Sequence, residues 1–223
     1  MSTGGRLTSG KKRTPSSRRW LERQLSDPYV AEARRQGYRS RAAFKLIEID
    51  DRFRLLRPGA RVVDLGAAPG GWAQVAARRT RAGTPGGGQI VAIDLLDMDA
   101  IEGATLLRHD FLDDEALTLI REALRGRSAD VVLSDMAPSA SGHRSVDHLR
   151  SMALAEAAVA FAEEILTPQG AFVAKVWQGG TESRLLATVK QAFAAVRHVK
   201  PPSSRAQSTE LYLVATGFRG AAR

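Results

Sequence analysis

Residues 62–72 read Val-Val-Asp-Leu-Gly-Ala-Ala-Pro-Gly-Gly-Trp, and this stretch decides the fold class. Two β-branched residues followed by a glycine-rich segment predict a buried strand that runs into a tight turn and then a helix. In an open α/β sheet, ligands bind at such a turn because it lies at the carboxyl ends of the parallel strands. Gly66, Gly70 and Gly71 lack the G-x-G-x-x-G spacing that holds a dinucleotide pyrophosphate. The turn is therefore a candidate ligand site without the dinucleotide fingerprint.

Strands and helices are expected to alternate after this stretch. Apolar runs such as 89–95 are typical of strands that are covered on both faces of a parallel sheet. Residues 195–200 and 211–216 both read as strands with no helix between them, so they should pair antiparallel at the sheet edge. We predict an α/β fold, Rossmann-like, with a mostly parallel doubly wound sheet and an antiparallel last strand. The other expected strands are 61–65, 104–108, 130–134 and 171–177, and the expected helices are 71–81, 113–124, 146–166 and 181–193.

The composition excludes several classes of protein. With 223 residues, 43% of them hydrophobic and 26% charged, the chain suits one globular domain with tails. Cysteine is absent, which excludes disulfides and a cysteine nucleophile and makes a reducing cytoplasm the expected location. No apolar run reaches the roughly 18 residues of a membrane span, so no membrane partner is expected. The four histidines have no ligand-like spacing, and we expect no metal.

Positive charge is concentrated at the N-terminus. Residues 1–41 hold eleven Lys and Arg against three acidic residues, a net charge of +8 out of +9 for the chain. A basic arm on a near-neutral body is typical of a protein that binds nucleic acid, although a solubilising tail is the plainer alternative. We expect a disordered basic tail at 1–19, a single catalytic domain at 20–218 that begins with a helical RNA-binding segment (20–56), and a short C-terminal tail at 219–223.

Acidic residues lie at or near the carboxyl ends of three of the expected strands. Asp64 lies in the first strand, Asp94 closes the second, and Asp110 follows the third. A carboxylate at the position of Asp94 can accept hydrogen bonds from both ribose hydroxyls, and Asp110 would lie near an adenine edge. Each residue alone could simply cap a following helix. Together they favour a nucleoside site whose ligand also carries a cationic group.

Lys175 is unusual because its strand is expected to be buried on both faces. Lysine is almost never fully buried without a partner, and Asp135 on the adjacent strand is the natural one. The alternative is a lysine that reaches solvent from the strand end. Desolvation beside other cations lowers the pKa of a lysine from about 10.4, and such a lysine can act as a base.

These motifs resemble the RrmJ/FtsJ-type ribosomal RNA 2′-O-ribose methyltransferases, the large-subunit methyltransferase E family. The resemblance covers residues 20–218 and rests on six stretches, at 40–46, 64–72, 94–99, 134–138, 175–179 and 203–217. It implies a methyltransferase fold, S-adenosylmethionine as the methyl donor, and ribosomal RNA of the large subunit as the partner. It further implies 2′-O-methylation of a uridine in the A-loop of 23S rRNA, in the cytoplasm.

The resemblance also implies roles for individual residues. The catalytic tetrad would be Lys45, Asp135, Lys175 and Glu210, with Lys175 as the general base. Lys45 would lower the pKa of Lys175 and steady the developing alkoxide, while the two acids orient the ammonium groups. The implied donor contacts are Gly70, Trp72, Asp94, Asp110 and Asp135. The chain departs from the closest family members at Ser139, where Asn is expected, and in a longer loop at 83–88.

Three alternatives remain open at this point. A nicotinamide-dependent oxidoreductase can share the fold, although the glycine spacing counts against it. A non-catalytic RNA-binding assembly factor could keep a methyltransferase shell, although an intact tetrad argues against that. A cap-type 2′-O-methyltransferase shares the tetrad and is disfavoured only by the short chain and the lack of a cap-binding insert.

Overall fold

The computed structural model describes residues 27–139, 141–177 and 183–220, so the basic tail predicted at 1–19 lies outside the described residues. Seven strands form one sheet in the order β3-β2-β1-β4-β5-β7-β6. The pairs among β1 to β5 are parallel, whereas β7 runs antiparallel to both β5 and β6. The strands are β1 (Arg61–Leu65), β2 (Gln89–Asp94), β3 (Ala104–Arg108), β4 (Ala129–Ser134), β5 (Leu166–Trp177), β6 (Phe193–Val199) and β7 (Glu210–Phe218).

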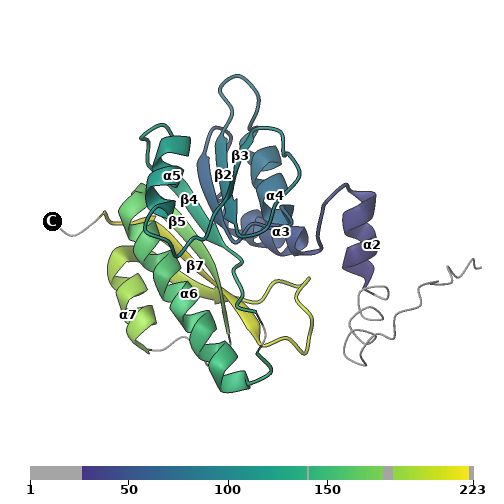
Figure 1. Cartoon of the computed structure of the whole chain (residues 1–223), viewed down its shortest axis with the longest axis vertical. Helices are drawn as coiled ribbons and strands as arrows, with labels where there is room; N and C mark the ends of the chain where they lie inside the picture. Colours follow the sequence, from purple (N-terminus) through teal and green to yellow (C-terminus); the bar gives the residue numbers. More distant parts are fainter. Residues whose placement is uncertain (1–26, 140, 178–182, 221–223) are drawn as a thin grey trace, which may run out of the picture.

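Helices cover both faces of this sheet (Figure 1). The helices are α2 (Pro28–Arg35), α3 (Ala42–Phe53), α4 (Gly71–Thr80), α5 (Ala116–Ala123), α6 (Arg144–Ile165) and α7 (Ser183–Ala192). Helices α3 and α4 lie on one side of the sheet, and α5, α6 and α7 lie on the other. The predicted doubly wound α/β fold with an antiparallel last strand is confirmed.

Side chains of the central strands point alternately to the two faces of the sheet, and they form a hydrophobic core on each face. Val63 and Leu65 of β1 are fully buried in the cluster with α5, α6 and α7, whereas Val62 is buried in the cluster with α3 and α4. A strand sandwiched in this way has no solvent-facing side, which explains why the residues of β1 are apolar except for Arg61 and Asp64.

The order of the strands places the ligand edge. From β1 the chain winds outward to β2 and β3, and then returns to β4 on the other side of β1. The switch point therefore lies between β1 and β4, where a crevice forms outside the carboxyl ends of the strands. The glycine turn of residues 66–70 and Asp135 both follow these two strands directly.

β5 differs most from its predicted bounds, since it begins at Leu166 rather than at 171. Pro168 and Gly170 read as turn residues, yet the segment pairs with β4 through a register shift between Ala129 and Val131. Gln169 takes a positive φ of 68°, which shows that an irregularity of the strand accommodates these residues.

The N-terminal helices are tied to the loop that precedes β7. Asp27 caps α2 by accepting a hydrogen bond from the Tyr29 N–H (3.1 Å), and its second oxygen forms ion pairs with Arg41 and Arg205. Arg41 also donates to the carbonyl of Ser203. These contacts hold α2, the start of α3 and the loop before Glu210 together.

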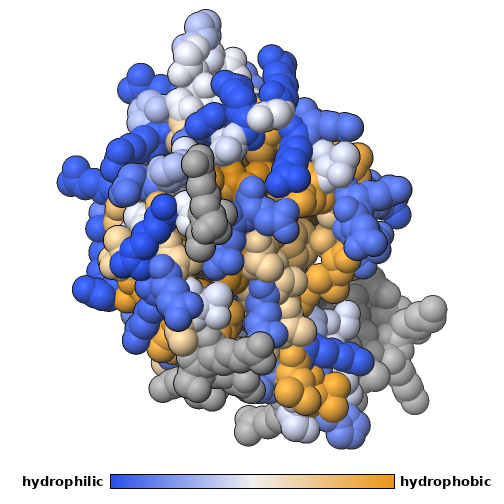
Figure 2. Space-filling model, turned by 90° about the vertical axis from the view of Figure 1, so that its left-hand side faces the viewer, coloured by the Kyte–Doolittle hydropathy of each residue, from blue (hydrophilic) through white to orange (hydrophobic). Residues whose placement is uncertain are grey.

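The side of the molecule that carries α5, α6 and α7 is largely hydrophilic, with apolar side chains visible between the polar ones (Figure 2). Within the described ranges, no helix has the length and apolar character needed to cross a membrane.

Candidate active site

Lys175 and Asp135 form an ion pair at the carboxyl edge of the sheet. The Lys175 Nζ lies 3.2 Å from the Asp135 Oδ1 and donates a hydrogen bond to the Asp135 backbone carbonyl (2.6 Å). Only 8% of the Lys175 side chain is exposed. The structure therefore gives this buried lysine the partner that the sequence predicted, and excludes a side chain that simply reaches solvent.

Lys45 and Glu210 form a second ion pair beside the first. The Lys45 Nζ of α3 lies 3.1 Å from the Glu210 Oε2 at the start of β7. Lys45 is mostly buried, whereas the Glu210 side chain is one-third exposed. Helix α3 thus brings a cation from far along the chain to the sheet edge.

Tyr212 joins the two ion pairs. Its hydroxyl donates a hydrogen bond to the Asp135 Oδ1 (2.8 Å) and accepts one from the Lys45 Nζ (3.0 Å). The side chain is fully buried and stands opposite Lys175 in the register of β5 and β7. We call these five residues, Lys45, Asp135, Lys175, Glu210 and Tyr212, the catalytic network, after the role proposed for them below. The structure brings together all four residues of the predicted tetrad and adds one that sequence reasoning missed.

The electrostatics of the network follow from burial and paired charge. Burial raises the pKa of Tyr212 well above its usual range, and the hydrogen bond and charge of Asp135 raise it further, so this hydroxyl stays protonated. Burial also acts to raise the pKa of Glu210, but the ammonium groups of Lys45 and Lys175 outweigh it, and the net effect is a lowered pKa. Tyr212 is therefore a neutral donor and Glu210 an anion near neutral pH.

Tyr212→Phe should reduce both stability and the rate of reaction. The free energy of unfolding in urea should fall by about 1–3 kcal/mol, because Lys45 and Asp135 each lose a buried hydrogen-bond partner. The turnover should fall by about tenfold, because one hydrogen bond that orients Lys45 and Asp135 is lost. The affinity for the donor should not change.

Tyr29→Phe is the matched control, because no hydrogen bond of the Tyr29 hydroxyl is found among the described residues. Equal stability and turnover in the two variants would show that the Tyr212 hydroxyl does not link the ion pairs.

Asp94 and Asp110, the residues predicted to bind the ribose and the adenine of a nucleoside, lie at the ends of neighbouring strands. Asp94 closes β2 and accepts backbone N–H bonds from Ala68 in the glycine turn and from Leu96, both at 2.9 Å. Asp110 follows β3 and accepts the N–H of Leu112 (2.9 Å). Each carboxylate has further lone pairs for a ligand. The bond to Ala68 means that Asp94 also fixes the shape of the turn.

Gly70 has a positive φ of 104°, a conformation that favours glycine, directly before α4. A Cβ at this position would come within 2.9 Å of both Arg39 and Ile101. The backbone therefore favours glycine here, whereas the two contacts are with the ends of side chains that can shift. The first N–H groups of α4 then face the ligand edge.

Trp72 lies in the first turn of α4, and its side chain packs inside the protein. It is 2% exposed, and its indole N–H donates a hydrogen bond to the Ala42 carbonyl (2.8 Å). Its ring contacts that of Tyr212, with centroids 5.5 Å apart. The side chain joins α3 and α4 to the catalytic network, so a donor contact of Trp72, which stays a prediction, would have to come from its backbone.

Asp64 tests whether a cationic ligand fits. The carboxylate is fully buried, and neither oxygen has a hydrogen-bond partner of normal geometry among the described residues. Burial raises its pKa well above the usual range, the charges of Asp135 and Asp94 raise it further, and the poorly aligned N–H of Ala73 lowers it least. A ligand with a positive charge would relieve this convergence of carboxyl groups. S-adenosylmethionine carries an ammonium and a sulfonium group, and its chemistry fits.

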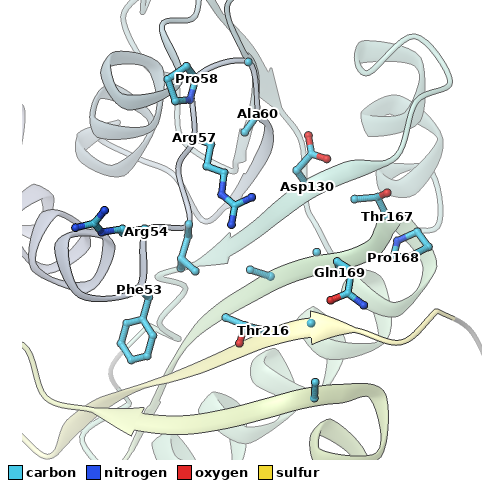
Figure 3. Close-up of a pocket in the computed structure, with 16 residues that line it drawn as sticks. Phe53, Arg54, Arg57, Pro58, Ala60, Asp130, Thr167, Pro168, Gln169 and Thr216 are labelled. Carbon is cyan, nitrogen blue, oxygen red and sulfur yellow. The ribbon is translucent and has the colours of Figure 1, made fainter.

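A large cavity lies away from the catalytic network. A cleft of about 950 Å³ opens at the amino ends of β1 and β4, opposite the ligand edge (Figure 3). Asp130 in its lining is already paired with Arg61 (2.9 Å), and no residue of the catalytic network lines the cleft. Because the cleft lacks these residues, its large volume is not evidence that the reaction takes place there. Over the described ranges, no group of three or more metal-ligating side chains is found.

The chain is similar in sequence to known proteins of one family. The family described as FtsJ-like methyltransferase matches residues 38–218. A Rhodospirillum rubrum protein named Ribosomal RNA large subunit methyltransferase E is 59% identical over 215 residues, covering 96% of this chain and 81% of that protein. A protein of the same name from Azorhizobium caulinodans is 57% identical, covering 97% of this chain and 90% of that protein.

A solved structure is also similar. The crystal structure of a Plasmodium falciparum protein described as a ribosomal RNA methyltransferase has a TM-score of 0.73 and 31% identity, over 82% of this chain and 100% of that chain. These similarities favour the methyltransferase interpretation of the sequence over a nicotinamide-dependent oxidoreductase.

Proposed function

Because this chain belongs to the FtsJ-like methyltransferase family, within the large-subunit methyltransferase E relatives, we propose that it methylates a ribose 2′-hydroxyl in ribosomal RNA of the large subunit. The methyl donor we propose is S-adenosylmethionine. The specific nucleotide that we propose as the target, a uridine in the A-loop of 23S rRNA, rests on the sequence resemblance described above. The corresponding location would be the cytoplasm, where the subunit assembles.

The catalytic network is the observation that carries the proposal. A ribose hydroxyl is a poor nucleophile, so its methylation requires a base for the proton and a cation for the developing negative charge. Two mostly buried lysines, each paired with a carboxylate and joined by Tyr212, supply both kinds of group beside the glycine turn. A binding protein without chemistry has no need of two desolvated ammonium groups at one point.

In the proposed mechanism, the Lys175 ammonium first releases a proton to solvent, and the resulting amine then accepts the proton of the 2′-hydroxyl. Asp135 holds this amine in place through its carboxylate and its backbone carbonyl. The Lys45 ammonium, oriented by Glu210 and Tyr212, faces the oxygen as negative charge develops. When bound, S-adenosylmethionine supplies an electrophilic methyl group on its sulfonium. Lys175 later returns its proton to solvent.

The residues that would hold the donor lie along the same edge. Asp94 would accept hydrogen bonds from the ribose hydroxyls, and Asp110 from the adenine edge. Gly70 would let the backbone approach closely, and Asp64 and Asp135 would face the cationic end. These assignments rest on where the strands end and on the carboxylate that lacks a partner.

The proposal is tested by mapping 2′-O-methylation in ribosomal RNA from cells with and without this protein. One 2′-O-methyl group in the large-subunit RNA should disappear without the protein, and purified protein with S-adenosylmethionine should restore it on isolated subunits. An identical methylation map in both cells would reject this function. A restored methyl group on a base would reject the ribose hydroxyl as acceptor.

The predicted basic tail should serve RNA affinity rather than chemistry. Removing residues 1–19 takes away six positive charges and should weaken RNA binding. The slope of log affinity against log salt should fall by about 0.7–0.9 for each lost phosphate contact. Donor affinity should not change.

A full-length variant with these six residues changed to Gln separates charge from length, and it should behave like the deletion. If both variants bind RNA with the affinity and salt slope of the unaltered protein, the tail only solubilises the chain.

A further inference from the structure

Trp177 stands next to the catalytic network at the open end of β5. It follows Lys175 by two residues, so both side chains lie on the same face of the strand, about 7 Å apart along it. In the register with β7, Lys175 is opposite Tyr212, and Trp177 is opposite Glu210. The indole is therefore the next side chain outward from the groups that handle the ribose hydroxyl.

This tryptophan belongs to neither hydrophobic core. Its side chain remains partly exposed, and its ring contact among the described residues is with His148 of α6. The two rings meet edge to face, with centroids 6.3 Å apart and planes at 62°. Here α6 carries exposed apolar side chains, with Leu149 64% and Val146 39% exposed. The indole is thus contacted by a second ring and keeps part of its surface exposed at the rim of the site.

A flat, partly exposed aromatic ring at this distance matches the chemistry of an RNA nucleobase. Proteins hold unstacked bases on aromatic side chains, and enzymes that act on a single nucleotide draw it out of its stack. A ribose whose 2′-hydroxyl reaches Lys175 carries its base close by, and Trp177 lies at the rim of the site, opposite Glu210. Stacking of this kind fixes the position of a base without selecting its identity.

We propose that Trp177, supported by His148, stacks on the nucleobase of the nucleotide being methylated and thereby directs its 2′-hydroxyl toward Lys175. This inference rests on the proposed function. It assigns Trp177 a role in positioning the acceptor, whereas the proton transfer belongs to Lys175. The alternative is that the indole only packs α6 against the sheet edge.

Trp177→Leu, Trp177→Phe and His148→Ala separate these two roles. The probe is a large-subunit RNA fragment containing the nucleotide that the unaltered protein methylates. Trp177→Leu keeps apolar volume but loses the aromatic face, and kcat/KM for RNA should fall by about 5- to 150-fold, the range for one base–aromatic stack. Trp177→Phe should retain most of the activity, and His148→Ala should show a smaller loss. Melting temperature and donor affinity should stay unchanged in all three.

An RNA whose target nucleotide keeps its ribose but lacks its base gives the decisive comparison. With the unaltered protein, removal of the base should lower kcat/KM by about the same factor as Trp177→Leu. With Trp177→Leu, removal of the base should cost little more, because the two changes remove one contact.

Additive losses, or a Trp177→Leu variant as active as the unaltered protein, would overturn the stacking role and leave the methyltransferase function intact. A lower melting temperature in both Leu and Phe variants, with activity falling in proportion, would also overturn it by showing a packing role. If the unaltered protein transfers no methyl group to RNA, the proposed function itself fails.

Discussion

Lys175→Ala is expected to abolish methyl transfer to RNA while leaving donor affinity within about twofold of the unaltered protein. A positioned general base contributes about 10²- to 10⁴-fold to the rate, and the other lysine of the network, Lys45, is held by Glu210 and Tyr212. The lysine pairs with Asp135 and acts on the acceptor hydroxyl, so its loss should lower kcat far more than it alters binding of either substrate. Single-turnover transfer from labelled S-adenosylmethionine measures the rate, and calorimetry measures donor affinity.

Lys175→Arg sharpens this test. Arginine keeps a positive charge next to Asp135, but it cannot be deprotonated in a protein, so it should be as inactive as alanine. Lys190→Ala is the matched control, because Lys190 is an exposed lysine on α7, away from the network. An arginine variant with near-normal turnover would show that position 175 supplies charge alone, and the base would have to be sought elsewhere.

The sequence predicts the fold well because each central strand carries its own evidence of burial. Apolar runs in β1, β2 and β4 have one physical explanation, a sheet covered on both faces, and the glycine turn identifies the ligand edge. The start of β5 is less predictable. Whether Pro168 and Gly170 end a strand or sit in an irregular one depends on the register with β4, which local sequence does not contain.

In the candidate site too, some residues can be predicted from local sequence and others only from contacts between distant segments. Lys175 stands out in the sequence because a lysine in a buried strand needs a partner, but the partners across the site come from segments far along the chain. Tyr212 was missed because a tyrosine in an apolar strand reads as core. Tyr212 follows Glu210 by two residues, so both side chains lie on one face of β7. This spacing is the feature of the sequence that could have identified Tyr212 as part of the site. Trp72 reads as a ligand residue beside the glycine turn, yet its indole hydrogen bond to α3 appears only in three dimensions.

The second large effect concerns the donor, and here Asp94→Ala is the informative change. The carboxylate would lose its hydrogen bonds to the donor ribose, each worth about 1.5–3 kcal/mol when one partner is charged, so the dissociation constant should rise at least tenfold. It would also release the N–H of Ala68 in the glycine turn, which adds to the loss. With saturating donor, the rate of transfer should recover most of its value, because Asp94 lies outside the catalytic network.

Asp97→Ala is the control for Asp94→Ala, since Asp97 lies in the same loop but is exposed and paired with Arg108 (2.6 Å). A donor analogue without ribose hydroxyls separates direct contact from the shape of the turn. If Asp94 binds the ribose, removal of the ribose hydroxyls should weaken binding to the unaltered protein much more than binding to Asp94→Ala, which has already lost those bonds. If removal of the hydroxyls weakens binding to both proteins by the same factor, Asp94 acts only by holding Ala68. An unchanged affinity of Asp94→Ala for S-adenosylmethionine itself would remove this residue from the donor site.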